Sequence, residues 1–187
     1  MVSPNPADEQ LEALAAQEMT KKHGVKIQVL SMARLEAGIK QFWCLNIYLD
    51  NYTLTIAGVG AQEAELKQLI ANNLLEHKVS MLGRIDYEAK SQLLASADVF
   101  CLPSKFDSFG MVHIEAMAAN LPVVALNYQA IPNVVPVFAG KLIVNDDEIS
   151  LSDAIKVVSE MCFSDSDIKS SEFVMKNILL DSEIKNG

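Results

Sequence analysis

The sequence predicts an α/β fold with a doubly wound parallel sheet of about six strands, a Rossmann-like arrangement. Short apolar segments alternate with amphipathic helical segments at intervals of roughly 25 residues. Most of these apolar segments are apolar at consecutive positions, which is typical of strands that helices cover on both faces. A chain of 187 residues is also long enough to bury the core of one such domain.

The expected strands are short runs rich in Val, Ile and Leu: 27–32, 52–57, 79–82, 99–102, 122–126 and 141–144. The expected helices have apolar residues at helical spacing: 8–22, 38–48, 61–77, 87–96, 110–120, 151–161 and 170–180. We therefore expect three parts. Residues 1–25 form a linker and an N-terminal helix, residues 26–162 form the sheet domain, and residues 163–187 form a helical tail.

Composition limits the classes of function. The net charge of −9 argues against a general nucleic-acid binder, which needs a basic face to contact phosphates. No apolar run approaches the ~18 residues of a membrane helix, and the N-terminus does not resemble a secretory signal. The three cysteines lack metal-ligand spacing and lie among apolar residues. The sequence thus predicts a cytoplasmic protein with no transmembrane segment and no metal site.

The two arginines indicate where a ligand binds. In doubly wound sheets the ligand lies beyond the carboxyl ends of the strands. Arg34 and Arg84 each come just after a predicted strand, and Gly83 directly precedes the second of them. A basic pocket for one small anion is therefore compatible with the acidic composition of the chain.

A second glycine-containing turn, Gly58-Val59-Gly60, follows a strand and opens a helix, as in dinucleotide-binding proteins. The third glycine of that pattern is Glu63, however, and no acidic residue stands about 20 residues further on. A carboxylate at this helix N-terminus would repel a pyrophosphate. The turn is therefore interpreted as a tight strand-to-helix connection without a dinucleotide.

The segment 102–118 combines a strand end, a loop and a helix start. Gly110 allows close backbone approach, and the amides of Gly110, Met111 and Val112 at the helix start are suited to an anion. Asp107 and Glu115 stand eight residues apart, so they could hold separate parts of one ligand. The alternative interpretation is an ordinary helix cap with a surface acid.

Residues 31–135 resemble the C-terminal domain of a large retaining glycosyltransferase family with the two-domain GT-B fold. The resemblance rests on six segments, in order and at near-normal spacing: 33–38, 54–60, 79–83, 97–104, 107–118 and 121–125. The most specific part is the run Ala-Asp-Val-Phe, Pro-Ser, Phe-Gly and Glu-Ala-Met-Ala within residues 97–118. The chain would then be the nucleotide-sugar-binding half of such an enzyme.

The resemblance implies a role for each matching residue. Arg34 would hold the diphosphate of the donor, and the backbone at Gly83 and Arg84 would face the nucleobase. Asp107 would contact the hydroxyls of the donor sugar as the catalytic carboxylate, and Glu115 would bind the ribose. The amides of Phe109, Gly110, Met111 and Val112 would meet sugar and phosphate. Members of this family transfer with retention and need neither a cofactor nor a metal, because helix N-termini and basic side chains stabilise the departing diphosphate.

Several positions depart from the family pattern. A phosphate-binding lysine is replaced by Ala37, and a motif glutamate is shortened to Asp107. The other departures are Ala33 for a glycine, Gln129-Ala130 for a glycine pair, and Asn133 for a glutamate. Two functions remain open. The first is a donor-binding domain for a UDP- or GDP-linked sugar that needs a separate acceptor-binding half, in polysaccharide or glycolipid biosynthesis. The second is a degenerate, non-catalytic binding or interaction module.

Overall fold

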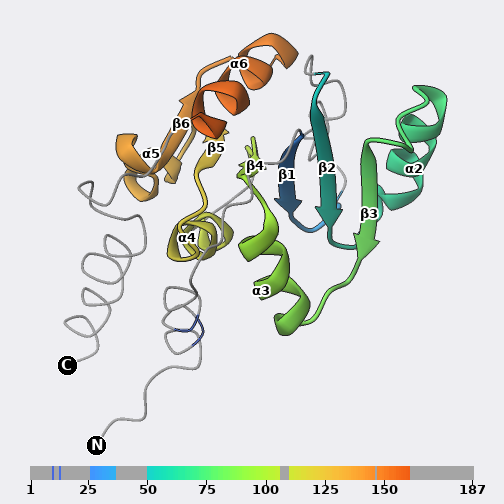
Figure 1. The fold of residues 1–187 in the computed structure, drawn as a ribbon, viewed down its shortest axis with the longest axis horizontal. Helices are drawn as coiled ribbons and strands as arrows, with labels where there is room; N and C mark the ends of the chain where they lie inside the picture. The colour runs from blue at the N-terminus through green and yellow to red at the C-terminus, as the bar shows by residue number, and fades with distance from the viewer. Residues whose placement is uncertain are drawn as a thin grey trace, which may run out of the picture.

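The computed structural model describes Gln10, Ala13 and residues 26–36, 50–105, 110–145 and 147–160. Its centre is one sheet of six parallel strands in the order β3-β2-β1-β4-β5-β6 (Figure 1). The strands are β1 (Ile27–Met32), β2 (Tyr52–Ala57), β3 (Val79–Gly83), β4 (Val99–Leu102), β5 (Val123–Leu126) and β6 (Gly140–Ile143). The predicted fold class is therefore confirmed, including the strand number.

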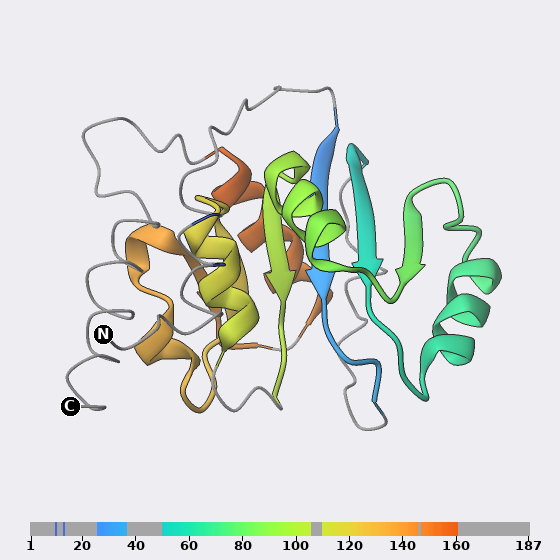
Figure 2. The same cartoon turned by 90° about the horizontal axis from the view of Figure 1, so that it is seen from below.

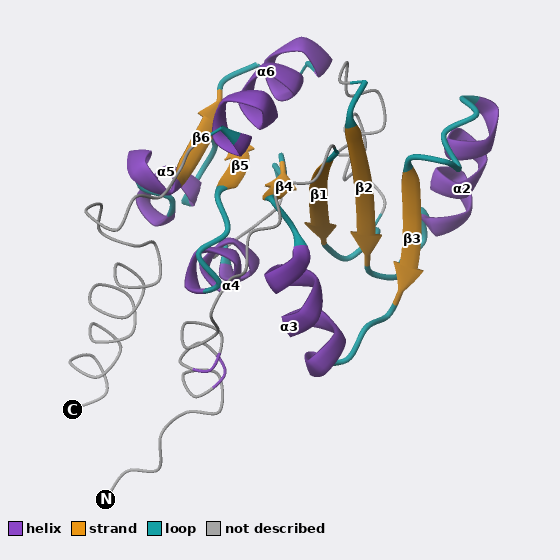
Figure 3. Cartoon of the chain, in the orientation of Figure 1, coloured by secondary structure: helices purple, strands orange, loops and turns teal. Residues whose placement is uncertain are grey.

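Helices connect the strands and cover both faces of the sheet (Figure 3). They are α2 (Glu63–Asn72), α3 (Tyr87–Ser96), α4 (Met111–Ala118), α5 (Ile131–Val134) and α6 (Glu148–Ser159), with a 3₁₀ turn at Val137–Ala139. In Figure 2, α3 and α4 lie in front of the sheet and α6 lies behind it. Within the described residues, no helix has the length and apolar character required to cross a bilayer.

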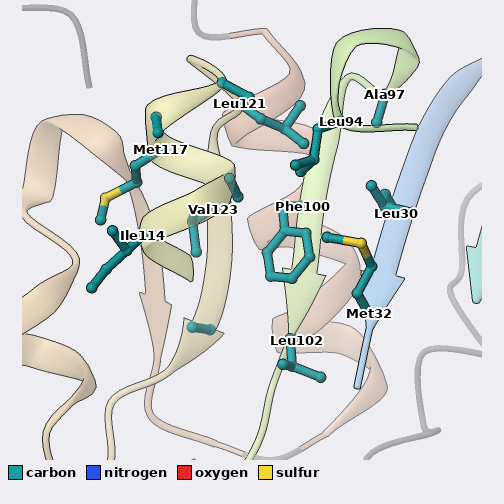
Figure 4. Close-up of a cluster of buried hydrophobic side chains, with 14 of the residues drawn as sticks. Leu30, Met32, Leu94, Ala97, Phe100, Leu102, Ile114, Met117, Leu121 and Val123 are labelled. Atoms are coloured by element: carbon teal, nitrogen blue, oxygen red, sulfur yellow. The ribbon is translucent and has the colours of Figure 1, made fainter. Parts of the chain in front are cut away.

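Alternate residues of the central strands enter two separate cores. In β4, Phe100 and Leu102 face the core under α3 and α4, whereas Val99 and Cys101 face the core under α2 and α6. Phe100 is fully buried and lies between Met32 of β1 and the residues of α4 and β5 (Figure 4). Burial on both faces explains why these strands are apolar at every position. The free thiol of Cys101, which the sequence places among apolar residues, is buried.

Two aspartates cap helices on the two faces. The Asp86 side chain accepts a hydrogen bond from the amide of Ala89 at the start of α3, over 2.8 Å. Asp147 accepts from both the amide and the hydroxyl of Ser150 at the start of α6. The backbone hydrogen bond from Ser150, followed by the one from its hydroxyl, lowers the pKa of Asp147 below its ordinary value of 3.8.

Helix boundaries differ from the sequence prediction more than strand boundaries do. The predicted helix 61–77 ends at Asn72, because Leu74 adopts a left-handed conformation with φ 55° and turns the chain. The predicted helix 151–161 begins at Glu148, because Asp147 caps it three residues earlier than expected. The sequence does not predict the helix α5. The predicted helices 38–48 and 170–180 lie outside the described residues, as does most of 8–22.

Candidate functional site

The strand order predicts a ligand-binding crevice at the boundary between β1 and β4. The chain runs outward from β1 through β2 to β3 and then returns to β4 on the other side of β1. The connections that leave β1 and β4 therefore diverge, and in open α/β sheets ligands bind at such a point. Figure 2 shows the arrowheads of β1 to β4 pointing the same way, so their carboxyl ends share one edge.

Arg34 lies at this edge, two residues after the end of β1. Hydrogen bonds of the residues before and after it fix its backbone. The amide of Ala33 donates to the Ala57 carbonyl oxygen over 3.1 Å, and the amide of Leu35 donates to that of Val59 over 3.0 Å. The side chain of Leu35 is fully buried, whereas Arg34 is exposed. The strand-like pairing thus continues past β1 and presents the guanidinium to solvent at the sheet edge.

Gly58 and Gly60 make this pairing possible. A Cβ on Gly58 would overlap the carbonyl oxygen of Ala33, and a Cβ on Gly60 would overlap that of Leu35. The amide of Gln62 also donates to the Leu35 carbonyl oxygen over 2.8 Å. The space beside both glycines is therefore filled by the backbone that carries Arg34. This packing agrees with the predicted tight strand-to-helix connection.

Gly83 and Arg84 lie at the same edge, two strands away from β1. The amide of Gly58 donates to the Gly83 carbonyl oxygen over 2.8 Å, which ties the end of β3 to the turn that supports Arg34. Gly83 has φ 68° and open space where a Cβ would lie, and Arg84 is exposed. Three successive loops are thus joined by backbone hydrogen bonds along one edge.

The start of α4 lies beyond β4, on the other side of β1. Gly110 is the N-cap of α4 with φ 65° and ψ 23°, and it is buried against Ile131 and Val134. Its carbonyl oxygen accepts from the amides of His113 and Ile114. Met111 and Val112 are the first two residues of α4, so their amides have no acceptor within the helix.

Glu115 lies just over one turn into α4 and is paired with a residue that the sequence did not single out. Its Oε1 accepts from Lys90 Nζ of α3 over 2.8 Å, and about a fifth of each side chain is exposed (21% and 22%). The sequence separation of 25 residues across two helices and a strand hides this pair from sequence reasoning. Among the sequence-predicted carboxylates, Glu115 is the one whose surroundings the structure describes.

The remaining predicted positions fall in two groups. Asp107, Phe109 and Ala37 lie outside the described residues. Gln129 is described and has φ 50°, a left-handed conformation that glycine adopts without strain. Gln129 thus adopts a conformation that favours glycine, at a position where the resemblance implies glycine.

Known proteins resemble this chain in sequence. Residues 2–167 match the family described as Glycosyl transferases group 1. A phosphatidyl-myo-inositol mannosyltransferase of Mycobacterium leprae is 31% identical over 172 residues, which cover 78% of this chain and 45% of the relative. An N-acetyl-alpha-D-glucosaminyl L-malate synthase of Bacillus anthracis is 37% identical over 82 residues, covering 44% of this chain and 21% of the relative.

Solved structures show the same fold. The lipopolysaccharide outer core galactosyltransferase WaaB superimposes with a TM-score of 0.71 at 18% identity, covering 89% of this chain and 50% of WaaB. HepE of Anabaena, solved in complex with UDP, superimposes with a TM-score of 0.69 at 20% identity, covering 99% of this chain and 52% of HepE. The chain thus spans about half the length of these proteins or less. Because the family match over residues 2–167 includes all six strands of the described sheet, this chain belongs to the group 1 glycosyltransferases.

Proposed function

We propose that residues 26–162 are a donor-binding domain that takes a UDP- or GDP-linked sugar for glycosyl transfer. The observation that carries the proposal is the fixed position of Arg34 at the sheet edge beside the β1–β4 boundary. Backbone hydrogen bonds hold the residues on both sides of it, and its guanidinium is exposed. A planar guanidinium that is always charged suits a diphosphate, which it can contact with two parallel hydrogen bonds.

The other site residues are assigned around this anchor. The backbone at Gly83 and Arg84 faces the nucleobase, and Glu115 accepts from the ribose hydroxyls. The amides of Gly110, Met111 and Val112, with that of Phe109, meet sugar and phosphate at the positive end of α4. Asp107 contacts the hydroxyls of the donor sugar.

Retention and independence of a metal belong to the same proposal. Arg34 and the first amides of α4 would stabilise the negative charge that develops on the departing diphosphate. In this proposal, transfer further requires a separate acceptor-binding half. The requirement for a second half is supported by the length of the relatives, because this chain covers 45% of the mannosyltransferase and 52% of HepE.

Binding of nucleotides to the purified chain tests the proposal. UDP is the first probe because HepE was solved with UDP, and GDP is the second because a Corynebacterium glutamicum relative is named GDP-mannose-dependent. Arg34→Ala should weaken binding of the preferred diphosphate by about 1.5–3 kcal/mol, the range for hydrogen bonds to charged groups. Calorimetry on both proteins measures this difference.

Lys67→Ala is the matched control, because Lys67 lies on α2 and pairs only with Glu63 on the same helix among the described residues. It should bind the diphosphate as the parent does. Equal affinity of the parent and Arg34→Ala would show that Arg34 does not anchor the phosphates. Absence of binding to UDP, GDP and ADP would remove the donor-binding function.

The alternative is a degenerate module that binds but does not catalyse. It is favoured by Ala37 in place of a phosphate-binding lysine and by Gln129 in a left-handed conformation where the family has glycine. Supplying the acceptor half of a related enzyme in trans separates the two functions. Transfer under these conditions supports the donor-binding domain, and nucleotide binding without transfer supports the degenerate module.

A further inference from the structure

The Lys90–Glu115 pair differs from the other ion pair among the described residues. Lys67 and Glu63 stand four residues apart on α2, and Lys67 is 60% exposed. Pairs of this kind contribute little, because solvent screens them and both side chains lose rotamer freedom. Lys90 and Glu115 instead join two different helices, and each side chain is about four-fifths buried. A contact of this kind fixes both side chains in one geometry.

The ammonium of Lys90 is also held from its own helix. Its Nζ lies 5.6 Å from the centre of the Tyr87 ring, one turn earlier on α3. The Tyr87 hydroxyl in turn donates to the carbonyl oxygen of Gln10 over 3.1 Å. Lys90 therefore approaches Glu115 from a restrained position and not as a mobile surface lysine.

The carboxylate of Glu115 keeps capacity for a ligand after this contact. Its neighbours in α4, Ile114 and Ala116, are buried, so the helix backbone is fixed against the core. Lys90 engages Oε1, and within the described part of the chain Oε2 makes no hydrogen bond. An ionised carboxylate has about four acceptor sites on its two oxygens. Glu115 can therefore accept from a diol and from Lys90 at the same time.

We propose that Lys90 is a positioning residue for the ribose of the nucleotide. By holding Oε1, Lys90 fixes the Glu115 carboxylate in the orientation in which Oε2 accepts hydrogen bonds from the ribose hydroxyls. The proposal rests on the proposed donor-binding function, in which Glu115 is the ribose ligand. A fixed acceptor loses little conformational entropy when the ribose binds, so the hydroxyls contribute more to affinity.

Two other roles of Lys90 predict different behaviour. If Lys90 only neutralised the charge of Glu115 near a diphosphate, its removal would weaken every diphosphate, with or without ribose hydroxyls. If it only joined α3 to α4, its removal would lower the free energy of unfolding and leave ligand selectivity unchanged. A positioning role concerns the hydroxyls alone.

The experiment combines protein variants with ligands that differ only in the ribose. UDP and GDP are each compared with their 2′,3′-dideoxy forms by calorimetry on the full 187-residue chain. The parent should prefer the ribose form of the bound nucleotide by at least about tenfold, as expected for hydrogen bonds to a charged acceptor. K90M should remove most of that preference while its affinity for the dideoxy form changes less than about twofold. K90R should restore at least half of the preference for the ribose form. The preference is measured as the logarithm of the ratio of the two dissociation constants, dideoxy form over ribose form.

Lys67→Met is the matched control, since it removes an ammonium from the other ion pair and should leave both affinities unchanged. Glu115→Ala should abolish the preference, and adding K90M to it should have no further effect. Unchanged preference in K90M would overturn the role of Lys90 while leaving Glu115 as the ribose ligand. An equal loss of affinity for the ribose and dideoxy forms in K90M would also overturn the role of Lys90. A parent with no preference for ribose would overturn this inference together with the role of Glu115.

Discussion

At the scale of single residues, the candidate site depends on positions without side chains. Gly60 lies where the turn after β2 contacts the loop that carries Arg34. The Leu35 carbonyl group occupies the space that a Cβ on Gly60 would need. Gly83 at the end of β3 has no atom within 4 Å of the position that a Cβ would take. The two glycines therefore serve different purposes, although both stand at strand ends on the same edge.

Gly60→Ala should destabilise the protein by about 2–3 kcal/mol, because the new methyl group must displace backbone and not a flexible side chain. Gly83→Ala is the matched control and should cost about 1 kcal/mol, since only its φ of 68° is unfavourable for alanine. Denaturant titrations of the three proteins measure the difference. Equal destabilisation by both substitutions would show that the loop after β1 yields easily and does not fix Arg34.

A site residue could be predicted from sequence where a residue type suited to the ligand closely follows a predicted strand. Arg34 and Arg84 follow strands in a chain with only two arginines, so their placement at the sheet edge could be inferred. Lys90 could not, since its partner lies on another helix and surface lysines are common in this chain. The roles of Arg34, Asp107 and Glu115 in binding stay predictions.

At the scale of elements, the strands could be predicted closely and the helix ends could not. A strand buried on both faces shows an unbroken apolar run that ends where burial ends, as in 99–102. A helix end depends on one or two capping residues. At the end of α2 the amide of Leu75 donates to Ile70 and that of Leu74 to Ala71. This is a Schellman motif with leucine at the position that usually carries glycine, so no glycine marks the end of the helix.

This unusual cap leads to a prediction about stability. Leu74 is 75% exposed and has φ 55°, so it gains little from burial and carries left-handed strain of about 1–2 kcal/mol. Leu74→Gly should therefore stabilise the protein by about 0.5–1 kcal/mol, after the greater entropy of unfolded glycine is subtracted. Thermal and denaturant unfolding measure the change.

The control is the same substitution one turn earlier. Leu69 lies within α2 and is also partly exposed, so Leu69→Gly should destabilise by about 1 kcal/mol or more through lost helix propensity. Opposite signs for the two substitutions are expected. Destabilisation by Leu74→Gly would mean that the leucine side chain makes a stabilising contact that outweighs the strain.

At the scale of the whole molecule, the sheet brings the separate loops to one edge. The 3-2-1-4-5-6 order places the loop after β1 between the loops of β2 and β4, so Arg34 lies at the centre of the edge. Gly83 and Arg84 extend the edge on one side, and Gly110 with α4 extends it on the other. The shared edge could be predicted from alternating strands and helices, because ligands of doubly wound sheets lie beyond the carboxyl ends of the strands. The strand order, and with it the central position of Arg34, comes from the structure. In the proposed function, the opposite wall of the reaction cleft comes from a second domain.

The 187-residue chain on its own should therefore bind a nucleoside diphosphate weakly and transfer no sugar. The electrostatic stabilisation of a departing diphosphate is strong in a cleft that excludes water, whereas Arg34 is exposed in this chain. Water would screen its charge and reach the donor sugar.

Ala37→Lys supplies the cation found in the family and should tighten diphosphate binding by about 1 kcal/mol. It should leave transfer undetectable, because added affinity for the donor does not build the second wall of the cleft. Incubation of both proteins with labelled nucleotide sugars and a panel of acceptors measures this. Acceptor-dependent transfer by the parent chain alone would show that this chain, alone or self-associated, closes the cleft without a separate acceptor-binding half.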